Sequence, residues 1–203
     1  TTGAPPSAVP APAALAAGEL ARPLPPPPRS ARVAAAVAGA RRILEEEGPS
    51  ALTMRRLADD LGIRAPSLYK HFANKAAVEL AIIEDALFDL GGVTHAALHG
   101  TGASGPLASL LTTYRTYCLA HPRLYRLAVS GQFPRHQLPE GLEEWAGNPW
   151  FVVTGDPALA QALWSFAHGM VILELDQRYP PGSDLDATWA AGAAAFEIAT
   201  TAR

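Results

Sequence analysis

Residues 53 to 75 contain two short helical patterns separated by a glycine. Apolar residues recur at helical spacing in the first pattern and predict one buried face: Met54, Leu57, Ala58 and Leu61. Thr53 is suited to cap a helix of about two turns, because its hydroxyl can accept a hydrogen bond from a free amide at the helix start. Gly62 follows directly, where a residue able to adopt positive φ ends a helix at little cost. The chain is therefore expected to stop, bend and restart.

The second pattern begins at Pro66, whose fixed φ and missing amide donor suit a first helical turn. Leu68 and Phe72, four residues apart, predict the buried side of this helix. The outer face or its edges would carry Arg64, Ala65, Ser67, Tyr69, Lys70 and His71. Helix, short glycine-bearing turn and helix is the order of a helix-turn-helix, whose second helix lies in the major groove of DNA. A surface helical hairpin with ordinary solvated charges is the alternative.

The geometry of a helix-turn-helix predicts two kinds of DNA contact. Residues near the start of the second helix reach base edges, where small side chains allow close approach and an alanine methyl can touch a thymine methyl. The candidates for this groove surface are Arg64, Ala65, Pro66, Ser67 and Lys70. Other side chains contact the sugar-phosphate backbone and position the protein without reading sequence. The candidates for that role are Thr53, Tyr69, His71 and Lys75.

The stretch from about Arg32 to Leu87 resembles the DNA-binding domain of TetR-family transcriptional regulators. The motifs that carry the resemblance are an opening helix that ends at Gly48, then LTMRRLADDLGI, RAPSLYKHF and the NK pair at residues 74–75. The resemblance implies an all-α fold with an N-terminal three-helix helix-turn-helix domain and a C-terminal helical domain for ligand binding and dimerisation. In that family the tyrosine and histidine of the LYxHF run, and the lysine after it, commonly contact phosphates. The resemblance gives these roles to Tyr69, His71 and Lys75.

The charge of the chain is unevenly distributed. Its net charge of −3 argues at first against a nucleic-acid partner. However, residues 29–75 carry nine Arg or Lys against five acids, whereas residues 76–203 carry six against thirteen. A basic head, residues 29–75, on an acidic body, residues 76–203, is the asymmetry expected when only one domain faces phosphates.

Residues 1–28 are predicted to form a separate tail. They hold nine of the nineteen prolines, with alanine and almost no charge, a composition typical of extended or disordered segments. Arg22, Arg29 and Arg32 could bring this tail to DNA; a passive leader is the alternative.

The cysteine count and the hydropathy suggest a location in the cell. A single cysteine, Cys118, cannot form an intramolecular disulfide, which fits a reducing compartment. No uninterrupted apolar run approaches the ~20 residues of a membrane span, and the start of the chain is proline-rich rather than basic and then apolar. We therefore expect a cytoplasmic protein without membrane anchor or signal peptide.

The body is predicted to be helical. The expected helices are residues 76–90, which Gly91 and Gly92 would end, 107–120, 122–130, a long helix from Pro157 to Gln177 or Arg178 with Asp156 as its cap, and a last helix to about Thr200. Ser183 and Asp186 resemble a capping box for the last helix. Prolines and glycines between residues 134 and 149 predict a loop without long helices.

The last two helices each carry an apolar stripe. These stripes are Leu159, Leu163, Phe166, Met170 and Leu173 on one helix, and Leu185, Trp189, Gly192, Phe196 and Ala199 on the other. Two copies could bury both in a four-helix bundle, which would make a homodimer with two reading heads about one DNA turn apart on a palindromic operator. Alternatively, these helices complete the core of a monomer.

Aromatic residues of the body could enclose an apolar cavity with a few polar groups. The candidates are Tyr114, Tyr117, Cys118, Phe133, Trp145, Trp150, Phe151, Trp164 and His168. In the family such a cavity holds an inducer, here an apolar or aromatic small molecule; ordinary core packing is the alternative. Residues 164–175 also resemble a C-terminal subfamily marked by tryptophan, histidine and glycine, which match Trp164, His168 and Gly169. His168 itself could be a hydrogen-bonded core histidine.

Other chemistries have weaker support. His95 and His99 have the spacing of a helical metal pair but lack a third ligand. Cys118 and His121 come without an oxyanion loop, and GASG at residues 102–105 is not a nucleophile elbow. We therefore expect no enzyme activity, cofactor or metal. The sequence favours a ligand-responsive transcriptional regulator, more in keeping with a repressor than an activator, with an architectural DNA-binding protein as the alternative.

Overall fold

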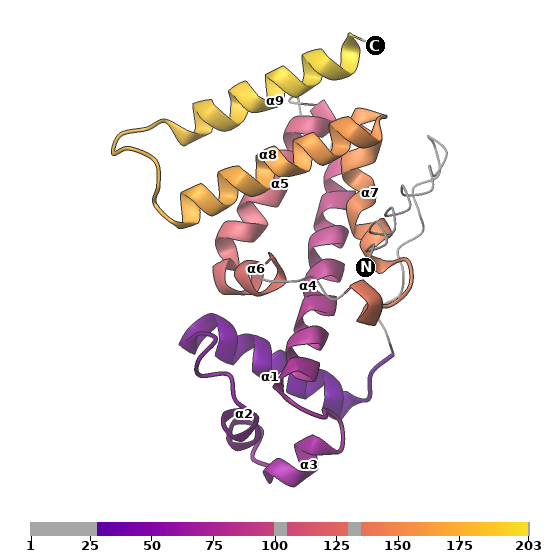
Figure 1. The fold of residues 1–203 in the computed structure, drawn as a ribbon, viewed down its shortest axis with the longest axis vertical. Helices are drawn as coiled ribbons and strands as arrows, with labels where there is room; N and C mark the ends of the chain where they lie inside the picture. The colour runs from indigo at the N-terminus through magenta and orange to yellow at the C-terminus, as the bar shows by residue number, and fades with distance from the viewer. Residues whose placement is uncertain (1–27, 100–104, 130–134, 203) are drawn as a thin grey trace, which may run out of the picture.

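The computed structural model describes residues 28–99, 105–129 and 135–202, and every regular element in these ranges is helical (Figure 1). The helices at the lower end in Figure 1 are α1 (Ala31–Glu47), α2 (Met54–Asp60) and α3 (Ala65–Tyr69). The others are α4 (Lys75–Leu98), α5 (Gly105–Ala120), α6 (Pro122–Val129), the 3₁₀ helix η1 (Arg135–Gln137), α7 (Leu142–Thr154), α8 (Pro157–Leu175) and α9 (Leu185–Thr201). The predicted all-α fold is confirmed. The predicted tail, apart from Pro28, and Phe133 lie outside the described residues.

Local signals set the geometry of α2 and α3. Thr53 caps α2, since its hydroxyl oxygen accepts a hydrogen bond from the Arg56 amide at 3.0 Å. Gly62 has a φ of +63° at the turn, a conformation that glycine adopts without steric cost. Leu68 and Phe72 are buried and attach the second helix to the core. The sequence-predicted helix, turn and helix are confirmed.

Two core clusters lie at opposite ends of the molecule. The first combines buried residues of α1, α2, α3 and the beginning of α4 with Leu124 of α6. The second combines α5, α7, α8 and α9 with Tyr125 of α6. The 24-residue helix α4 runs from the first end into the second, where it packs against α5 and α7 (Figure 1). It is therefore the continuous connection between the two clusters.

The prediction that Gly91 and Gly92 end this helix was wrong. α4 continues through both residues to Leu98. Gly91 is buried against the Trp145 ring, and a Cβ at residue 91 would lie 2.5 Å from the nearest ring carbon. A glycine within a helix costs about 1 kcal/mol relative to alanine, but here it lets a tryptophan pack on the helix backbone.

The loop predicted between residues 134 and 149 is also incorrect, because α7 is a 13-residue helix that contains Pro149. Proline has no amide with which to bond the carbonyl four residues earlier, which here belongs to Trp145. The imidazole Nε2 of His95 on α4 donates to that carbonyl at 2.9 Å, and its ring stacks on Trp145 with centroids 5.0 Å apart. A side chain from another helix thus supplies the hydrogen bond that the proline removes.

The last two helices begin close to their predicted positions. Asp156 caps α8 by accepting from the Leu159 amide at 2.8 Å, as predicted. α8 ends at Leu175, slightly before the predicted end. The cap of α9 is Asp184, which accepts from Ala187 N at 2.9 Å, so the predicted capping box at Ser183 was wrong.

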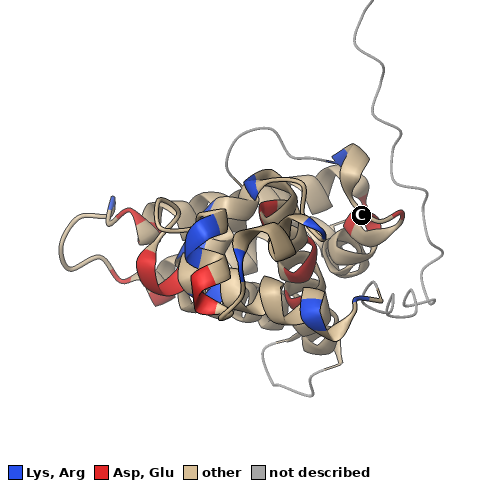
Figure 2. Ribbon diagram, turned by 90° about the horizontal axis from the view of Figure 1, so that it is seen from below, with Lys and Arg blue, Asp and Glu red and all other residues tan. Residues whose placement is uncertain are grey.

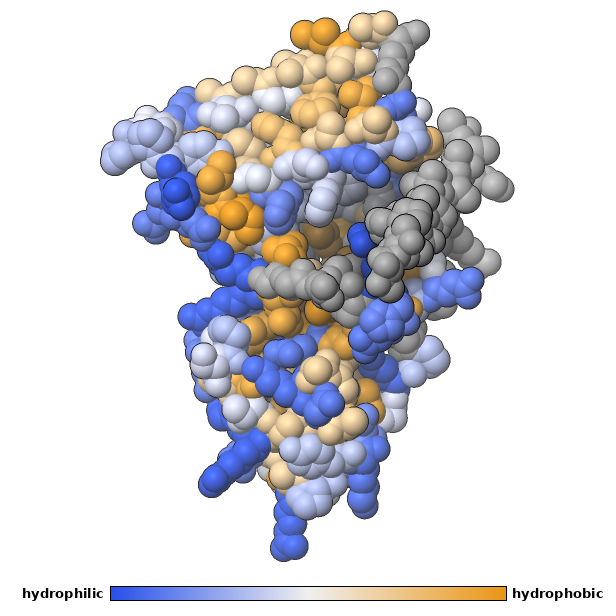
Figure 3. Space-filling model, viewed as in Figure 1, coloured by the Kyte–Doolittle hydropathy of each residue, from blue (hydrophilic) through white to orange (hydrophobic). Residues whose placement is uncertain are grey.

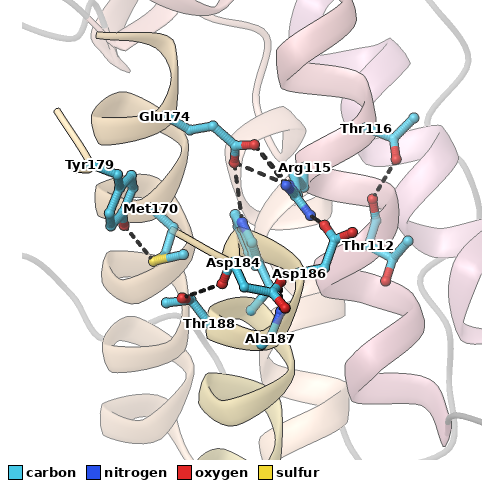
Figure 4. Close-up of polar contacts among 11 residues, drawn as sticks. Thr112, Arg115, Thr116, Met170, Glu174, Tyr179, Asp184, Asp186, Ala187 and Thr188 are labelled. Carbon is cyan, nitrogen blue, oxygen red and sulfur yellow. Dashed lines mark hydrogen bonds and ion pairs between the residues drawn. The ribbon is translucent and has the colours of Figure 1, made fainter. Parts of the chain in front are cut away.

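A charged cluster fastens α8 and α9 to α5 (Figure 4). The Arg115 guanidinium on α5 pairs with Glu174 on α8 at 2.7 Å and with Asp186 on α9 at 2.5 Å. Trp189 Nε1 donates to Glu174 at 3.2 Å, and Arg115 also lies 5.6 Å from the centre of the Trp189 ring. Asp186 therefore pairs with Arg115, which explains why it does not complete a capping box.

α8 is long and apolar enough to cross a membrane by length and composition alone, with 19 residues and a mean hydropathy of 1.3 over its best window. The core helix of a soluble protein passes the same test, so this finding does not contradict the prediction that no apolar run approaches a membrane span. That prediction counted uninterrupted apolar residues, whereas the average tolerates a few polar ones such as Gln161 and His168. In the structure α8 packs against α5, α7 and α9.

Candidate nucleic-acid interface

The surface predicted to contact DNA lies at the end of the molecule that α3 forms (Figure 1). α2 contacts α1 on one side and α3 on the other. None of the nine predicted residues is buried, and hydrophilic side chains project from this end of the molecule (Figure 3). The exposed ones are Thr53, Arg64, Pro66, Tyr69, Lys70 and His71, while Ala65, Ser67 and Lys75 are half-buried.

α3 is short but well anchored. Its core side is held by Leu68, and the turn continues past the helix because the amides of His71 and Phe72 both donate to the Leu68 carbonyl, at 2.9 and 3.1 Å. The outer side chains from Arg64 to His71 therefore extend from a backbone that is held in place by the buried Leu68 and by these hydrogen bonds. A fixed backbone lowers the entropy that a helix loses when it enters a groove.

Several cations of the head are engaged in ion pairs within the protein. Arg56 pairs with Glu47 of α1 at 2.6 Å and with Asp60 at 3.4 Å, and Arg42 of α1 also pairs with Asp60. The hydrogen bond from Arg42 lowers the pKa of Asp60, and the hydrogen bond to Glu47 raises the pKa of Arg56. These charges hold α2 against α1.

Two further cations join segments of the chain. The Lys75 ammonium donates to the Pro49 carbonyl at 3.0 Å and lies 3.4 Å from Glu79. Arg29 pairs with Glu84 on α4 at 2.6 Å and also with Asp85. Arg29, which could have brought the tail to DNA, is thus fastened to α4.

The remaining cations of this surface are free of such partners. Across residues 28–99, 105–129 and 135–202, no ion pair or hydrogen bond engages the side chains of Arg55, Arg64 or Lys70. All three are exposed. Figure 2, which shows the molecule from this side, places Lys and Arg among several acidic residues. The local pairing pattern, more than the net charge, therefore decides which cations can bind a phosphate.

Arg55 is a candidate that sequence reasoning missed. On α2, Arg56 and Asp60 face α1. Arg55 precedes Arg56 by one residue, so it points about 100° away from Arg56 around the helix axis. It also lies within the first turn after the cap Thr53, itself a phosphate candidate. That shared position at the start of α2 was the available signal.

The aromatic residues predicted to bind a ligand are mostly packed in the body. Tyr114, Cys118, Trp145 and Trp150 are buried. The Tyr114 hydroxyl lies 2.8 Å from the Tyr125 hydroxyl, which in turn lies 2.6 Å from Nδ1 of His168. Burial raises the pKa of both tyrosines and raises that of Cys118 to about 12.

His168 connects this buried group to the outer face of α8. Burial lowers its pKa, and its ring stacks on Trp164, with centroids 5.4 Å apart. Trp164 is 44% exposed. His168 is thus a hydrogen-bonded histidine with an exposed aromatic neighbour.

Two surface grooves are present on the body. One, of about 320 Å³, is lined by Leu98, Pro106, Leu107, Val152, Val153, Glu197, Thr200 and Thr201. The other, of about 340 Å³, is lined by Val93, Thr112, Thr113, Thr116, Tyr117, Ala120 and His121. Of the predicted ligand residues, only Tyr117 lines either groove, and its hydroxyl accepts a hydrogen bond from Arg41 of α1 at 3.3 Å.

The apolar stripes predicted for a dimer largely face each other within one chain. Leu163, Met170 and Trp189 are buried. The Phe166 ring packs against Trp189 with centroids 5.8 Å apart, and a Cβ at residue 192, which is glycine, would lie 2.1 Å from the Phe166 ring. Leu173 of the predicted stripe stays 41% exposed, and two apolar side chains outside the stripes are also exposed, Trp164 at 44% and Ile198 at 69%.

The described part of the chain holds no group of three His, Cys, Asp or Glu residues suited to a metal ion. His95 is instead committed to Trp145, and burial lowers its pKa.

Comparison with known proteins is consistent with these features. Residues 36–82 match the family model "Bacterial regulatory proteins, tetR family", and residues 107–196 match "Tetracyclin repressor-like, C-terminal domain". An uncharacterised HTH-type transcriptional regulator of Mycobacterium tuberculosis, Rv0681, is 32% identical over 157 residues, which are 68% of either protein.

Solved structures share the fold. A protein of unknown function from Rhodococcus sp. RHA1 has a TM-score of 0.65 at 20% identity, over 85% of this chain and 97% of its own. A TetR variant from Acinetobacter baumannii AYE, crystallised with minocycline, has a TM-score of 0.57 at 23% identity, over 79% and 91%. The predicted absence of enzyme activity agrees with the family, whose members regulate transcription. From its helix-turn-helix, its helical body and its relatives, the chain belongs to the TetR family of DNA-binding transcriptional regulators.

Proposed function

We propose that the protein is a ligand-responsive repressor that binds a palindromic operator as a homodimer. The observation that carries this proposal is the exposed α3 surface, where Arg64 and Lys70 have no ion-pair partner among the described residues. Unpaired cations next to a groove-reading helix can contact bases or phosphates without first breaking internal bonds. TetR-family regulators bind operator DNA as dimers and bind small-molecule ligands.

The proposed DNA contacts divide into two groups. Base edges would be read by Arg64, Ala65, Ser67 and Lys70, and Pro66 would let the helix approach the groove closely. Phosphates would be contacted by Thr53, Tyr69, His71 and Lys75, to which we add Arg55. Thr53 can do so while it caps α2, because its oxygen accepts the Arg56 amide and its hydroxyl hydrogen remains able to donate. Lys75 would have to exchange its bond to Pro49 for a phosphate.

The proposed dimer uses the outer faces of α8 and α9. Trp164, Leu173 and Ile198 expose apolar surface there, and only 22% of the apolar window of α8 is buried inside one chain. Exposed apolar surface on two long helices is stabilised when a second copy covers it. Leu173 belongs to the predicted stripe, whereas Trp164 and Ile198 do not, so this face overlaps the predicted one only in part.

The proposed inducer is an apolar or aromatic small molecule bound by the body. The minocycline in the Acinetobacter structure supports an aromatic ligand for that relative. Tyr114, Tyr117, Cys118, Trp145, Trp150, Trp164 and His168 remain the proposed ligand residues. Most of these side chains are packed in the core or exposed at the surface in this conformation. A ligand would therefore select another conformation, in which the body opens around it and the heads separate.

Three further assignments accompany this proposal. We propose that the body belongs to the subfamily marked by tryptophan, histidine and glycine, because Trp164, His168 and Gly169 match its pattern. The functional units are the tail 1–28, the head 29–75 and the body 76–203. The protein acts in the cytoplasm, because its operator is there, and it needs no cofactor.

The decisive experiment is selection of bound sequences from a random double-stranded DNA pool at two salt concentrations. We expect a two-fold symmetric site with half-sites about one helical turn apart. Salt-sensitive binding without a recovered sequence would favour the alternative of an architectural DNA-binding protein.

Variants then separate base reading from phosphate binding. Ser67→Ala or Lys70→Ala should change the selected sequence, whereas Arg55→Ala should weaken all sites alike and reduce the slope of log affinity against log salt by about 0.9. Arg56→Ala is the matched control for Arg55, because its guanidinium already pairs with Glu47. An Arg55 variant with the wild-type salt slope would remove this residue from the phosphate contacts.

A further inference from the structure

α6 touches both core clusters through consecutive residues. Leu124, only 1% exposed, belongs to the first cluster, with α1, α2, α3 and the start of α4. Tyr125 belongs to the second cluster, and its hydroxyl lies 2.6 Å from Nδ1 of His168 on α8. This eight-residue helix therefore joins the helix-turn-helix end of the molecule directly to the helix that exposes Trp164.

The end of α1 and the start of α6 cap each other. Glu45 Oε1 accepts a hydrogen bond from Leu124 N at 2.6 Å, and Oε2 accepts a longer one from Arg123 N at 3.4 Å. In the opposite direction, the Arg123 guanidinium donates to the main-chain oxygen of Glu45 at 2.8 Å.

The charges at this junction have the favourable sign for both helices. The first amides and the last carbonyls of a helix have no partner within it. Their partial charges favour an acid at the start of a helix and a base at its end. Glu45 supplies the acid to α6, and Arg123 supplies the base to α1, although α6 follows α1 by more than seventy residues in the sequence. The two helix ends are thus held as one unit.

The other connections run through α4, with which Arg29 pairs, and through Arg41, which also donates to the Tyr117 hydroxyl of α5. α4 fixes the distance between the two ends of the molecule, but a long helix can bend along its length. Arg41 of α1 pairs with Asp89 of α4 at 2.5 Å, near the middle of both helices. The Glu45 contacts lie one helical turn beyond Arg41, near the end of α1, so they oppose rotation of α1 about the Arg41 contact from the side opposite Arg29.

We infer that Glu45 is a positioning residue that sets the angle of the helix-turn-helix relative to α8 and α9, and so the half-site spacing that the dimer accepts. This inference rests on the proposed function, because spacing has meaning only for two heads on one operator. Glu45 itself touches no DNA in this scheme. It acts through α6, whose neighbouring residues Leu124 and Tyr125 contact the two clusters.

The test uses the full-length protein and duplexes that carry the selected half-sites at the selected spacing, or one or two base pairs closer or further apart. Binding is measured for the wild type, Glu45→Ala, Glu45→Gln and Glu46→Ala. Glu46 is a matched control, because it is the adjacent acid of α1 and pairs with Arg42 of the same helix at 3.2 Å.

We expect the wild type to prefer one spacing by about tenfold or more. Binding at another spacing would require the hydrogen bonds to the Glu45 carboxylate to break, and loss of one hydrogen bond to a charged acceptor changes an equilibrium by about that factor. In Glu45→Ala this preference should fall to about threefold or less, while the preferred bases within each half-site stay the same. Glu45→Gln keeps one acceptor oxygen without the charge and should lie between. Glu46→Ala should match the wild type.

Other outcomes separate the inference from the function on which it rests. A Glu45→Ala protein that loses affinity equally at every spacing, or keeps the wild-type preference, overturns the positioning role. A wild type without any spacing preference refutes the dimeric operator instead. If thermal unfolding shows that Glu45→Ala is unfolded, Arg123→Met takes its place, because it removes the reciprocal bond to the Glu45 carbonyl and leaves the carboxylate intact. The same two outcomes then decide.

Discussion

Replacing Gly91 by alanine tests why α4 continues through two adjacent glycines. A Cβ at residue 91 would lie 2.5, 2.9 and 3.0 Å from three ring carbons of Trp145, which is itself buried. Overpacking of this kind costs about 1–3 kcal/mol. The higher helix propensity of alanine stabilises the folded state by about 1 kcal/mol, which offsets part of this cost. Because three ring atoms are involved, we expect Gly91→Ala to lower the free energy of unfolding by about 1–2 kcal/mol.

Gly92→Ala is the matched control in the same helix. Gly92 is exposed, and a Cβ there would meet no atom within 4 Å. The helix propensity gain then stands alone, and the variant should be more stable than the wild type by about 0.5–1 kcal/mol. In a chain of this size, 1 kcal/mol shifts Tm by about 2–4 °C, so the two variants should differ by roughly 3–12 °C.

The assay is thermal and urea unfolding of both variants at one protein concentration, because the proposed dimer would make apparent stability depend on concentration. If both variants are stabilised equally, close packing of Trp145 on the helix backbone is not the reason for glycine at residue 91.

Three other results are expected. Urea unfolding should show that stability falls as pH drops below about 6.5, because burial lowers the pKa of His95 and His168 and the unfolded chain then binds more protons. The contribution of the two histidines to stability is complete above that pH. A His95→Gln, His168→Gln protein with the wild-type pH slope would contradict this expectation. Glu174→Gln should lower the free energy of unfolding by about 1–3 kcal/mol in the same assay, since it weakens charged hydrogen bonds to α5 and α9. Asp186→Asn, at a site 88% exposed, should lower it by less than about 0.5 kcal/mol. Equal losses would refute this ranking. Cys118, buried and with its pKa raised to about 12, should react with a thiol reagent at neutral pH only as fast as the protein unfolds, and an immediate reaction would show that the thiol is accessible.

The helix-turn-helix was predictable because its signals are local. The Thr53 cap, the Gly62 turn and the Leu68–Phe72 pair each act within about four residues. The exposure of the predicted DNA-contact residues followed from the same periodicity. Which cations are already paired did not follow, because Arg56 is matched by Glu47 and Lys75 by the Pro49 carbonyl, through contacts that depend on how α1 and α4 pack.

The errors in the body have a common physical origin. Pro149 and Gly91 are helix breakers by propensity, but a partner from a distant segment compensates for each. His95, fifty residues before Trp145, supplies the hydrogen bond that Pro149 removes, and the Trp145 ring fills the space that Gly91 leaves. The role of the aromatic set stays a prediction, since sequence spacing cannot distinguish a cavity lining from a packed core.

The length of α4 has a mechanical consequence for regulation. At about 1.5 Å per residue, its 24 residues form a rod of about 36 Å that begins beside α3 and ends in the body. A tilt of about 5° at the body end would swing the other end through about 3 Å. That arc is close to the 3.4 Å rise between successive base pairs of DNA. Rearrangements in the body of only a few degrees would thus suffice to move a recognition helix out of register with its half-site.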